Sequence, residues 1–405
     1  MDSENTLTQL ETTSEYTKSS DTESLRIGSA ALVSISHGVH DGFSSFLPAL
    51  LPLLIEKFAL NNTMAGSLNL LHQLPALTQP LIGYLADRHN LRNAVIFAPA
   101  ITAICMTFLG NSPSIGFMLP LLFLSGLSSS ALHVIGPVLL GRFSGSKLGR
   151  GMSFWMVGGE LGFSIGPLLL VSILGVLSLR WLPVISLFGI LISLILWLRL
   201  NNVTTVTKKT GVVVDWRTKI GELMHILLPA SLLVMLRSLS HVSLTTFLPT
   251  FMTSQGSSLW FAGATFSIVG GAGVVGSLIA GTLSDRYGRK LFLAISFVMT
   301  PIVMLLFLRT QILWQQVVLL ILMGFFGLSI MPVMMALVLG SSPDNRSLIS
   351  GLYMAVSFLF LALASVVIGR LADLYSLRFT FSLSALVLLL GLPVLLLLPK
   401  EKKTA

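Results

Sequence analysis

The sequence predicts an all-α membrane protein in which twelve transmembrane helices form two pseudo-symmetric halves of six helices each. Three observations predict this fold class: an apolar composition, a series of long apolar runs and a loop motif that occurs twice. Of the 405 residues, 54% are hydrophobic and 10% are charged, whereas soluble domains carry about 25% charged residues. Together with a mean hydropathy of +0.88, this composition excludes an ordinary soluble domain.

The apolar runs are long enough to cross a membrane, since a spanning helix needs about 20 apolar residues. A polar interval in the middle of the chain separates six runs from six others. The predicted spans are residues 27–55, 64–86, 94–111, 114–140, 151–175, 181–199, 223–252, 259–284, 291–308, 312–339, 348–370 and 377–398.

The spans define two halves, residues 27–199 and 223–398, joined by a cytoplasmic connector at 200–222. Residues 1–26 are rich in Ser and Thr and poor in apolar side chains, which is typical of a disordered tail, and residues 399–405 form a second tail. Lys and Arg are concentrated in the loops on the side of both termini, which predicts that both termini are cytoplasmic. We expect a multi-pass protein of the bacterial inner membrane, in which the formal charge of +9 is a topology signal.

A loop motif occurs at corresponding places in the two halves. The stretch "GYLADRHNLRN" begins at Gly83, and "GTLSDRYGRKL" begins at Gly281. The glycine of each copy is expected to let two helices approach closely, and the aspartate to accept from a helix N-terminus or an arginine. A simple basic turn is the alternative interpretation. The predicted gating residues are Gly83, Asp87, Arg88, Arg92, Gly281, Asp285, Arg286, Arg289 and Lys290.

On these residues the chain resembles the major facilitator superfamily, whose loop motif reads G-x-L-A-D-R-x-G-R-K. The copy at Gly281 is nearly complete, whereas the copy at Gly83 departs from the motif at residues 89–91. The resemblance covers residues 27–398 and implies a transporter whose substrate site lies between the halves, near the middle of the membrane. It also implies that spans 1, 2, 4, 5, 7, 8, 10 and 11 line the central cavity.

Two further resemblances concern the direction of transport. Span 5 contains Gly162, Gly166 and Pro167 in a pattern that resembles the antiporter motif of exporters in the superfamily, although leucines replace its final glycines. Small residues at this spacing also occur in any closely packed span. The stretches "SHGVHDG", "QPLIGYLAD", "SSALH" and "VGGELGFSIGPLL" are similar to the fosmidomycin-resistance branch of drug exporters. The chain departs from that branch after His133, where a Pro-Glu pair is missing, and at Glu160, which replaces a neutral polar residue.

Ionisable side chains lie deep within several predicted spans. Such residues face the interior of a helix bundle or a watery cavity, and they indicate function. His37, His40 and Asp41 have the spacing of one helix face. The predicted proton-coupling residues are Asp41, Glu160, His40 and His37, and the predicted substrate-binding residues are His72, Gln73, His133, Arg237 and His241.

The chemistry of these residues suggests their roles. Burial favours the neutral form of a carboxylate, and a nearby cation favours its charged form. Asp41 is therefore the expected main proton carrier, with Glu160 second, and the histidines can relay protons near neutral pH. Arg237 is expected to pair with a carboxylate or to hold an anionic group of the substrate. One alternative is a fixed ion pair between Asp41 and Arg237, and another is a packing role for His72 or His133.

The sequence thus predicts a proton-coupled antiporter that exports a small polar or amphipathic drug or metabolite and acts as a monomer. An importer or uniporter of the same fold is one alternative, and a non-transporting sensor or lipid-handling scaffold is another. The chain shows no P-loop and no nucleophile-turn motif, so we expect gradient coupling, no enzyme activity, no cofactor and no nucleic-acid partner. Zinc is not expected, because His37 and His40 have little support beyond Asp41.

Overall fold

The computed structural model of the chain describes residues 26–144, 148–200, 216–341 and 346–398. Every regular element within these ranges is a helix, which confirms the all-α fold class. The two expected tails, apart from Arg26, lie outside the described residues. The same holds for residues 201–215 of the expected connector.

Each half is a series of helices that pass back and forth. The first half consists of α2 (Ile27–Ser44), α3 (Phe46–Phe58), α4 (Asn62–Gln73), η1 (Leu74–Thr78), α5 (Gln79–Arg88), α6 (Arg92–Leu109), α7 (Ile115–Ser144), α8 (Leu148–Leu174), η3 (Leu179–Ile185) and α9 (Ser186–Leu200). The second half consists of α10 (Trp216–Val242), η4 (Ser243–Phe247), α11 (Leu248–Ser254), α12 (Leu259–Tyr287), α13 (Arg289–Phe307), α14 (Leu313–Leu328), α15 (Ile330–Ser341), α16 (Arg346–Leu374), α17 (Leu377–Leu388) and α18 (Gly391–Leu397).

Eleven helical segments among the described residues are long and apolar enough to cross a membrane, and they match eleven of the expected spans. The remaining expected span, 64–86, corresponds to α4, η1 and α5 and is not among the eleven. A 3₁₀ turn that begins at Leu74 divides it, and α4 carries Asn69, His72 and Gln73. The polar side chains that make this segment a candidate site therefore also lower its hydropathy.

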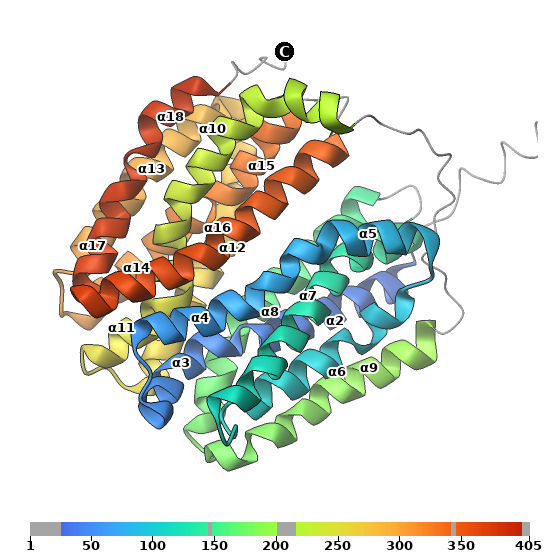
Figure 1. Ribbon diagram of the computed structural model, residues 1–405, viewed down its shortest axis with the longest axis horizontal. Helices are drawn as coiled ribbons and strands as arrows, with labels where there is room; N and C mark the ends of the chain where they lie inside the picture. Colours follow the sequence, from blue (N-terminus) through green and yellow to red (C-terminus); the bar gives the residue numbers. More distant parts are fainter. Residues whose placement is uncertain (1–25, 145–147, 201–215, 342–345, 399–405) are drawn as a thin grey trace, which may run out of the picture.

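The two halves lie side by side and meet along two pairs of helices (Figure 1). Across the interface α4 packs on α16 and α8 packs on α12, and within the first half α2 packs on α8. Helix α10 begins at Trp216, within the stretch 200–222 that we expected to be the connector. A helix satisfies its own backbone hydrogen bonds, so α10 can continue beyond the apolar run that defines the span.

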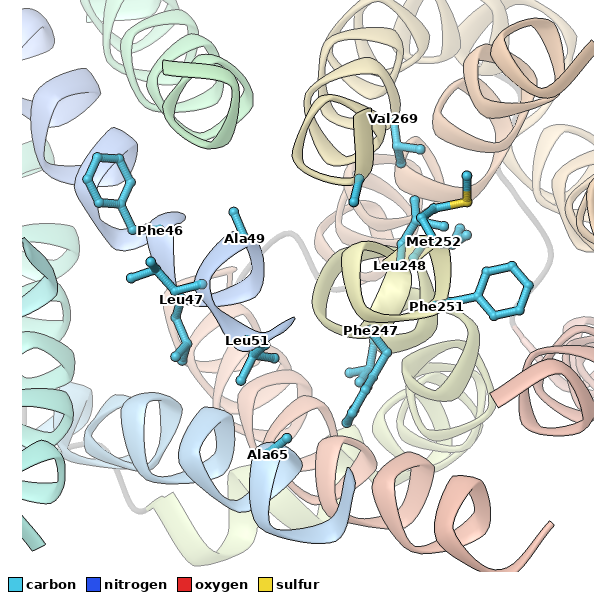
Figure 2. Close-up of a cluster of buried hydrophobic side chains, with 14 of the residues drawn as sticks. Phe46, Leu47, Ala49, Leu51, Ala65, Phe247, Leu248, Phe251, Met252 and Val269 are labelled. Carbon is cyan, nitrogen blue, oxygen red and sulfur yellow. The ribbon is translucent and has the colours of Figure 1, made fainter. Parts of the chain in front are cut away.

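A shared apolar core joins the halves at one end of the molecule. We call the end where α2 begins and α18 ends the terminal end, and the opposite end, where α3 and α11 end, the distal end. Leu47 and Leu51 of α3 belong to the same buried cluster as Leu248 and Phe251 of α11 (Figure 2). Because protein interiors are close-packed, this cluster closes the distal end to solvent.

A carboxylate at the end of α16 strengthens the same closure. Asp373 accepts hydrogen bonds from the backbone N–H groups of Asn62 and Thr63, each at 2.8 Å. The side chains of both residues donate to the same carboxylate, at 2.9 and 2.5 Å. A helix N-terminus presents unsatisfied N–H groups and a partial positive charge. Asp373 of the second half therefore holds the start of α4 in the first half.

Glycines on α12 and α16 indicate that the halves separate toward the terminal end. A Cβ at Gly263 of α12 would lie 2.3 Å from a side chain of α8, and a Cβ at Gly369 of α16 would lie 2.2 Å from a carbonyl oxygen of α4. Gly281 lies 18 positions after Gly263, and Gly351 lies 18 positions before Gly369. This is five turns at about 3.6 residues per turn, so the two glycines of each helix lie on the same helix face. A Cβ at Gly281 or Gly351 would meet no atom within 4 Å. Along these two faces the interface is closed at the distal end and open at the terminal end.

Candidate functional site

Helices α2 and α8 pack so closely that only small residues fit between them. A Cβ at Gly162 would lie 1.9 Å from the carbonyl oxygen of Gly38, and a Cβ at Gly166 would lie 2.1 Å from that of Gly42. The facing residues are Gly158, Gly162 and Gly166 on α8 and Ser34, Gly38 and Gly42 on α2. The expected antiporter-like motif, with Pro167 inside α8, therefore supplies two of the glycines that hold α2 against α8.

His37 is fixed on α2 by this packing. Its ring stacks on the ring of Trp155 in α8, with the centroids 3.7 Å apart and the planes at 14°. A Cβ at Gly159 would lie 2.3 Å from His37 Cε1, so this glycine makes room for the ring. His37 Nδ1 lies 3.0 Å from the carbonyl oxygen of Trp155. A carbonyl oxygen only accepts, so Nδ1 donates, and Nε2 of the neutral ring presents a lone pair.

His133 of α7 is held in the same way. Its Nδ1 lies 2.8 Å from the carbonyl oxygen of Ser129, one turn earlier in the helix. Nδ1 therefore donates, and Nε2 of this ring also presents a lone pair when the ring is neutral. The side chain of His133 is 36% exposed, so solvent can reach it.

Asp41 brings the two histidines into one cluster. His37 Nε2 lies 3.0 Å from Asp41 Oδ2, and His133 Nε2 lies 3.7 Å from Asp41 Oδ1. The two Nε2 atoms lie 3.3 Å from each other. Lone pairs that converge in a largely buried place repel one another unless a proton or another cation lies between them. His37, Asp41 and His133, which we call the Asp41 cluster, therefore present a set of lone pairs that a proton or a metal ion can bind.

The Asp41 cluster also has the dimensions of a metal site. Its three ligand atoms lie within 4.8 Å of one another. Tetrahedral zinc with bonds of about 2.0–2.1 Å separates two nitrogen ligands by about 3.3 Å, as between the Nε2 atoms here. Backbone carbonyls that accept from both Nδ1 groups are typical outer contacts of metal-binding histidines. The expectation against zinc considered only His37 and His40, and it did not foresee that α7 contributes His133.

The other two predicted proton-coupling residues lie beside this cluster. His40 is fully buried, with Nδ1 at 3.4 Å from the carbonyl oxygen of Ala98 in α6 and Nε2 at 4.0 Å from Asp41 Oδ1. Glu160 of α8 is exposed and interacts electrostatically with all three members of the Asp41 cluster. The structure thus places His40 on the inner side of Asp41 and Glu160 on the solvent side.

Arg237 and His241 lie on α10, in the second half. Arg237 is 2% exposed. Its Nη2 lies 3.1 Å from His241 Nδ1, and its Nη1 donates to the sulfur of Met331 at 3.7 Å. Within the described part of the chain, Arg237 forms no ion pair with a carboxylate, and Asp41 is engaged by histidines. The alternative of a fixed pair between Asp41 and Arg237 is therefore absent from this conformation.

His72 and Gln73 end α4. His72 Nε2 lies 3.4 Å from Ser125 Oγ of α7, and a Cβ at Gly126 would lie 2.0 Å from the carbonyl oxygen of His72. These contacts pack α4 onto α7, in line with the packing alternative for His72. Gln73 is half-buried beside it.

The second copy of the loop motif ties helices together within one half. Arg289 donates to Asp285 Oδ1 at 2.8 Å and to the carbonyl oxygen of Ala336 at 2.8 Å. Lys290 donates to the carbonyl oxygen of Leu398 at 2.5 Å. The motif therefore joins α12, α13 and α15 and holds the residue that follows α18.

The glycines of the two copies do not make the close helix approach that we expected. A Cβ at Gly83 would meet one side-chain atom at 3.7 Å, which is an ordinary contact, and a Cβ at Gly281 would meet nothing within 4 Å. This expectation is wrong for the present conformation, because the α8–α12 interface has opened before it reaches Gly281.

The remaining predicted gating residues lie at the ends of helices. Arg88 lies 4.1 Å over the ring of a nearby tyrosine, and Arg286 lies 5.3 Å over another. Arg92 is the first residue of α6. The side chain of Asp87 lies outside the described part of the structure.

Three residues of the site and of its closure were not predicted from the sequence. Trp155 and Gly159, which hold His37, lie beside the G-x-x-x-G repeat of α8, and that repeat signals close packing. Asp373 ends "GRLAD", a further copy of the G-x-L-A-D pattern near the distal end of the second half. A search for the pattern at both ends of the spans could have found it.

The family model of the Major Facilitator Superfamily matches residues 33–286 and 232–405. The chain is 25% identical over 375 residues to the fosmidomycin resistance protein of Escherichia coli (strain K12), covering 90% of this chain and 91% of that protein. It is 25% identical over 305 residues to the multi-drug resistance efflux pump PmrA homolog of Lactococcus lactis subsp. lactis (strain IL1403), covering 71% and 73%.

A solved structure shares the fold. The crystal structure of the nucleoside transporter NupG matches with a TM-score of 0.75 at 15% sequence identity, covering 92% of this chain and 99% of that one. At this level of identity the likeness shows the fold alone.

Proposed function

Since the chain belongs to the major facilitator superfamily, we propose that it is a proton-coupled antiporter that exports a small polar or amphipathic organic compound. The protein is a multi-pass membrane transporter and not an enzyme. The observation that carries the proposal is the Asp41 cluster, in which three groups with lone pairs require a cation.

The Asp41 cluster suits a coupling site because its access to solvent can change. The Asp41 side chain is 14% exposed and that of His133 36% exposed, in a molecule that is open toward the terminal end. Rocking of the halves about the central site would close that end and open the other. The same groups would then exchange protons with the other side of the membrane, with Glu160 and His40 as neighbours. Such a cycle couples proton entry to the exit of substrate.

We propose that the terminal end faces the cytoplasm of a bacterial cell, because Lys and Arg are concentrated in the loops at that end. The present conformation is then inward-facing. Asp373 and the apolar core between α3 and α11 would close the external side. In the opposite state, the loop motifs around Asp87 and Asp285 would latch the cytoplasmic side.

The direction of transport rests on the relatives. Two of them carry names that refer to fosmidomycin resistance and to multidrug efflux. The stretch with Gly162, Gly166 and Pro167 resembles the exporter motif, in addition to packing α8 on α2. Both features favour export over import.

Proteoliposomes with an internal pH-sensitive dye test the proposal. Amphipathic and phosphonate-like compounds are added to vesicles that contain wild type, Asp41→Asn or the control Glu56→Gln, whose carboxylate is exposed on α3. A metal chelator is present throughout, so that a bound metal ion does not replace the proton. We expect substrate-triggered proton movement in wild type and in the control, and its loss in Asp41→Asn.

The other outcomes separate the alternatives. Equal proton movement in wild type and Asp41→Asn would overturn the role of Asp41. Substrate transport without proton movement would indicate a uniporter, and proton and substrate movement in the same direction would indicate an importer. Compounds that bind without being transported would favour a sensor or scaffold.

A further inference from the structure

The guanidinium of Arg237 is buried without adequate acceptors. It carries five N–H donors and no acceptor. Nη2 donates to His241 Nδ1, and Nη1 donates to the sulfur of Met331. Sulfur is only a weak acceptor. The third nitrogen, Nε, has no hydrogen-bond partner. An uncompensated charge at 2% exposure is strongly destabilising. The site therefore lacks an anionic partner.

The described part of the second half does not supply that partner. Asp285 is paired with Arg289, and Asp373 accepts from the start of α4. Both carboxylates lie near helix ends, whereas Arg237 lies within α10. An anion from outside the chain can supply the missing charge.

Two further side chains beside Arg237 offer hydrogen-bond donors. Because the guanidinium only donates, His241 Nδ1 accepts, and the proton of the neutral ring is on Nε2. The hydroxyl of Tyr353 in α16 is buried beside the Ser357 side chain without a well-formed hydrogen bond, and Tyr353 interacts electrostatically with Arg237. Donors without matching acceptors thus come from two helices.

We propose that Arg237, His241 and Tyr353 form a binding site for an oxyanion, namely a carboxylate, phosphate or phosphonate group of the transported compound. A guanidinium fits such groups because its planar fork can make two parallel hydrogen bonds to their oxygens. The part that concerns transport rests on the proposed function, whereas the binding of the oxyanion does not.

The position of this oxyanion site suits a transporter. The π-helical turn η4 (Ser243–Phe247) begins two residues after His241, and such turns are frequent at functional sites. This turn packs against α3 of the other half, so occupancy of the oxyanion site can influence the interface. The first half carries the cation site at Asp41 and the second half carries the oxyanion site. The transported compound is therefore an anion or a zwitterion.

Thermal unfolding of the purified full-length protein in neutral detergent tests the oxyanion site without any gradient. The probe is inorganic phosphate, compared with chloride at equal ionic strength. A second arm uses mixed micelles that contain phosphatidylglycerol, because a lipid headgroup carries the same chemistry. The proteins are wild type, Arg237→Gln, Arg237→Lys, Tyr353→Phe and the control Arg309→Gln, whose side chain is exposed.

We expect phosphate to raise the unfolding temperature of wild type and of Arg309→Gln above the chloride value. Apparent affinity should fall at least about tenfold in Arg237→Gln and about two- to tenfold in Tyr353→Phe, as the loss of a charged and of a neutral hydrogen bond implies. Arg237→Lys keeps the charge and should bind better than Arg237→Gln. An Arg237-dependent effect in the lipid arm alone identifies a headgroup site and overturns the assignment to transported substrate.

Two results would overturn the oxyanion site itself. One is an equal response of wild type and Arg237→Gln to phosphate and to phosphatidylglycerol. The other is recovery of transport in the double variant Arg237→Gln/Glu160→Gln, because that rescue indicates an ion pair between the halves in another state. A normal response to phosphate in Asp41→Asn would leave the oxyanion site in place even if proton coupling fails.

Discussion

His37 Nε2 and His133 Nε2 lie 3.3 Å apart, with the two rings nearly perpendicular at 81°. In each ring Nδ1 donates a hydrogen bond to a backbone carbonyl, one on α8 and one on α7. The two histidines therefore face each other and Asp41 with lone pairs. Their proximity makes the packing of α2 against α7 sensitive to the presence of a bound cation.

Replacing His133 by glutamine should make the contact between α2 and α7 independent of a bound cation. An amide N–H can donate to Asp41 or to His37 without a bound proton. We expect substrate-triggered proton movement in proteoliposomes to fall at least about tenfold, as expected for the loss of one charged hydrogen bond. Ser129→Ala is the control, because it removes a hydroxyl 3.3 Å from His133 Nδ1 and keeps the carbonyl. Similar proton movement in both variants would exclude the cluster as the proton site.

Gly162→Ala should loosen the contact between α2 and α8. The added Cβ would lie 1.9 Å from the carbonyl oxygen of Gly38. Because this oxygen belongs to the backbone, the clash is relieved only if α2 and α8 move apart. We expect a loss of about 1–3 kcal/mol in the free energy of unfolding, visible as a lower unfolding temperature in detergent. Gly28→Ala is the control, since a Cβ there meets nothing within 4 Å, and alanine is the better helix former. Equal unfolding temperatures for the two variants would contradict the close packing.

Long apolar runs were sufficient to predict the spans, and helix periodicity was sufficient to predict part of the Asp41 cluster. The spacing of His37 and Asp41 places them on one helix face, and the structure has both in contact. Their meeting with His133 depends on how α2, α7 and α8 pack, and no local pattern contains that information. The segment 64–86 was predicted as a span from its apolar run, although it is not among the apolar segments that the structure identifies.

Other features lay beyond what helix periodicity can give. Asp373 falls between the predicted spans 348–370 and 377–398, and its role appears only when the start of α4 from the other half lies beside it. The pairing of Arg237 depended on which helices meet, so the sequence left it open. Gly281 was expected in a close helix contact, and this conformation does not make that contact. A transporter has at least two conformations, and the sequence does not say in which of them a given contact forms.

Asp373→Asn should weaken the closure of the distal end. An asparagine keeps a single acceptor oxygen and loses the charge that faces the N-terminus of α4. We expect the population that is open at the distal end to rise at least about tenfold. Spin labels on cysteines introduced at positions 56 and 309, one in each half, would report longer distances. Arg370→Gln, an exposed change on the same helix, is the control, and unchanged distances in Asp373→Asn would show that this carboxylate does not hold the halves together.

Two alanine substitutions on one face of α16 should act in opposite directions. In Gly369→Ala the Cβ would lie 2.2 Å from the carbonyl oxygen of Asn62. The halves must then part at the distal end, at a cost of about 1–3 kcal/mol to the present state. In Gly351→Ala the Cβ would meet nothing within 4 Å, so the present state is unaffected. If the terminal end closes during transport, however, the same Cβ hinders that closure and slows turnover.

The spin-label pair at positions 56 and 309 distinguishes the two substitutions. We expect longer distances in Gly369→Ala, and wild-type distances with reduced substrate transport in Gly351→Ala. Longer distances in both variants would mean that Gly351 already contacts the first half. Gly351 lies five turns from Gly369 on the same face of α16. If this part of the face closed onto the first half as tightly as it does at Gly369, an added methyl group at Gly351 would have no room. Wild-type transport in Gly351→Ala would therefore mean that the face of α16 near the terminal end stays open throughout the cycle.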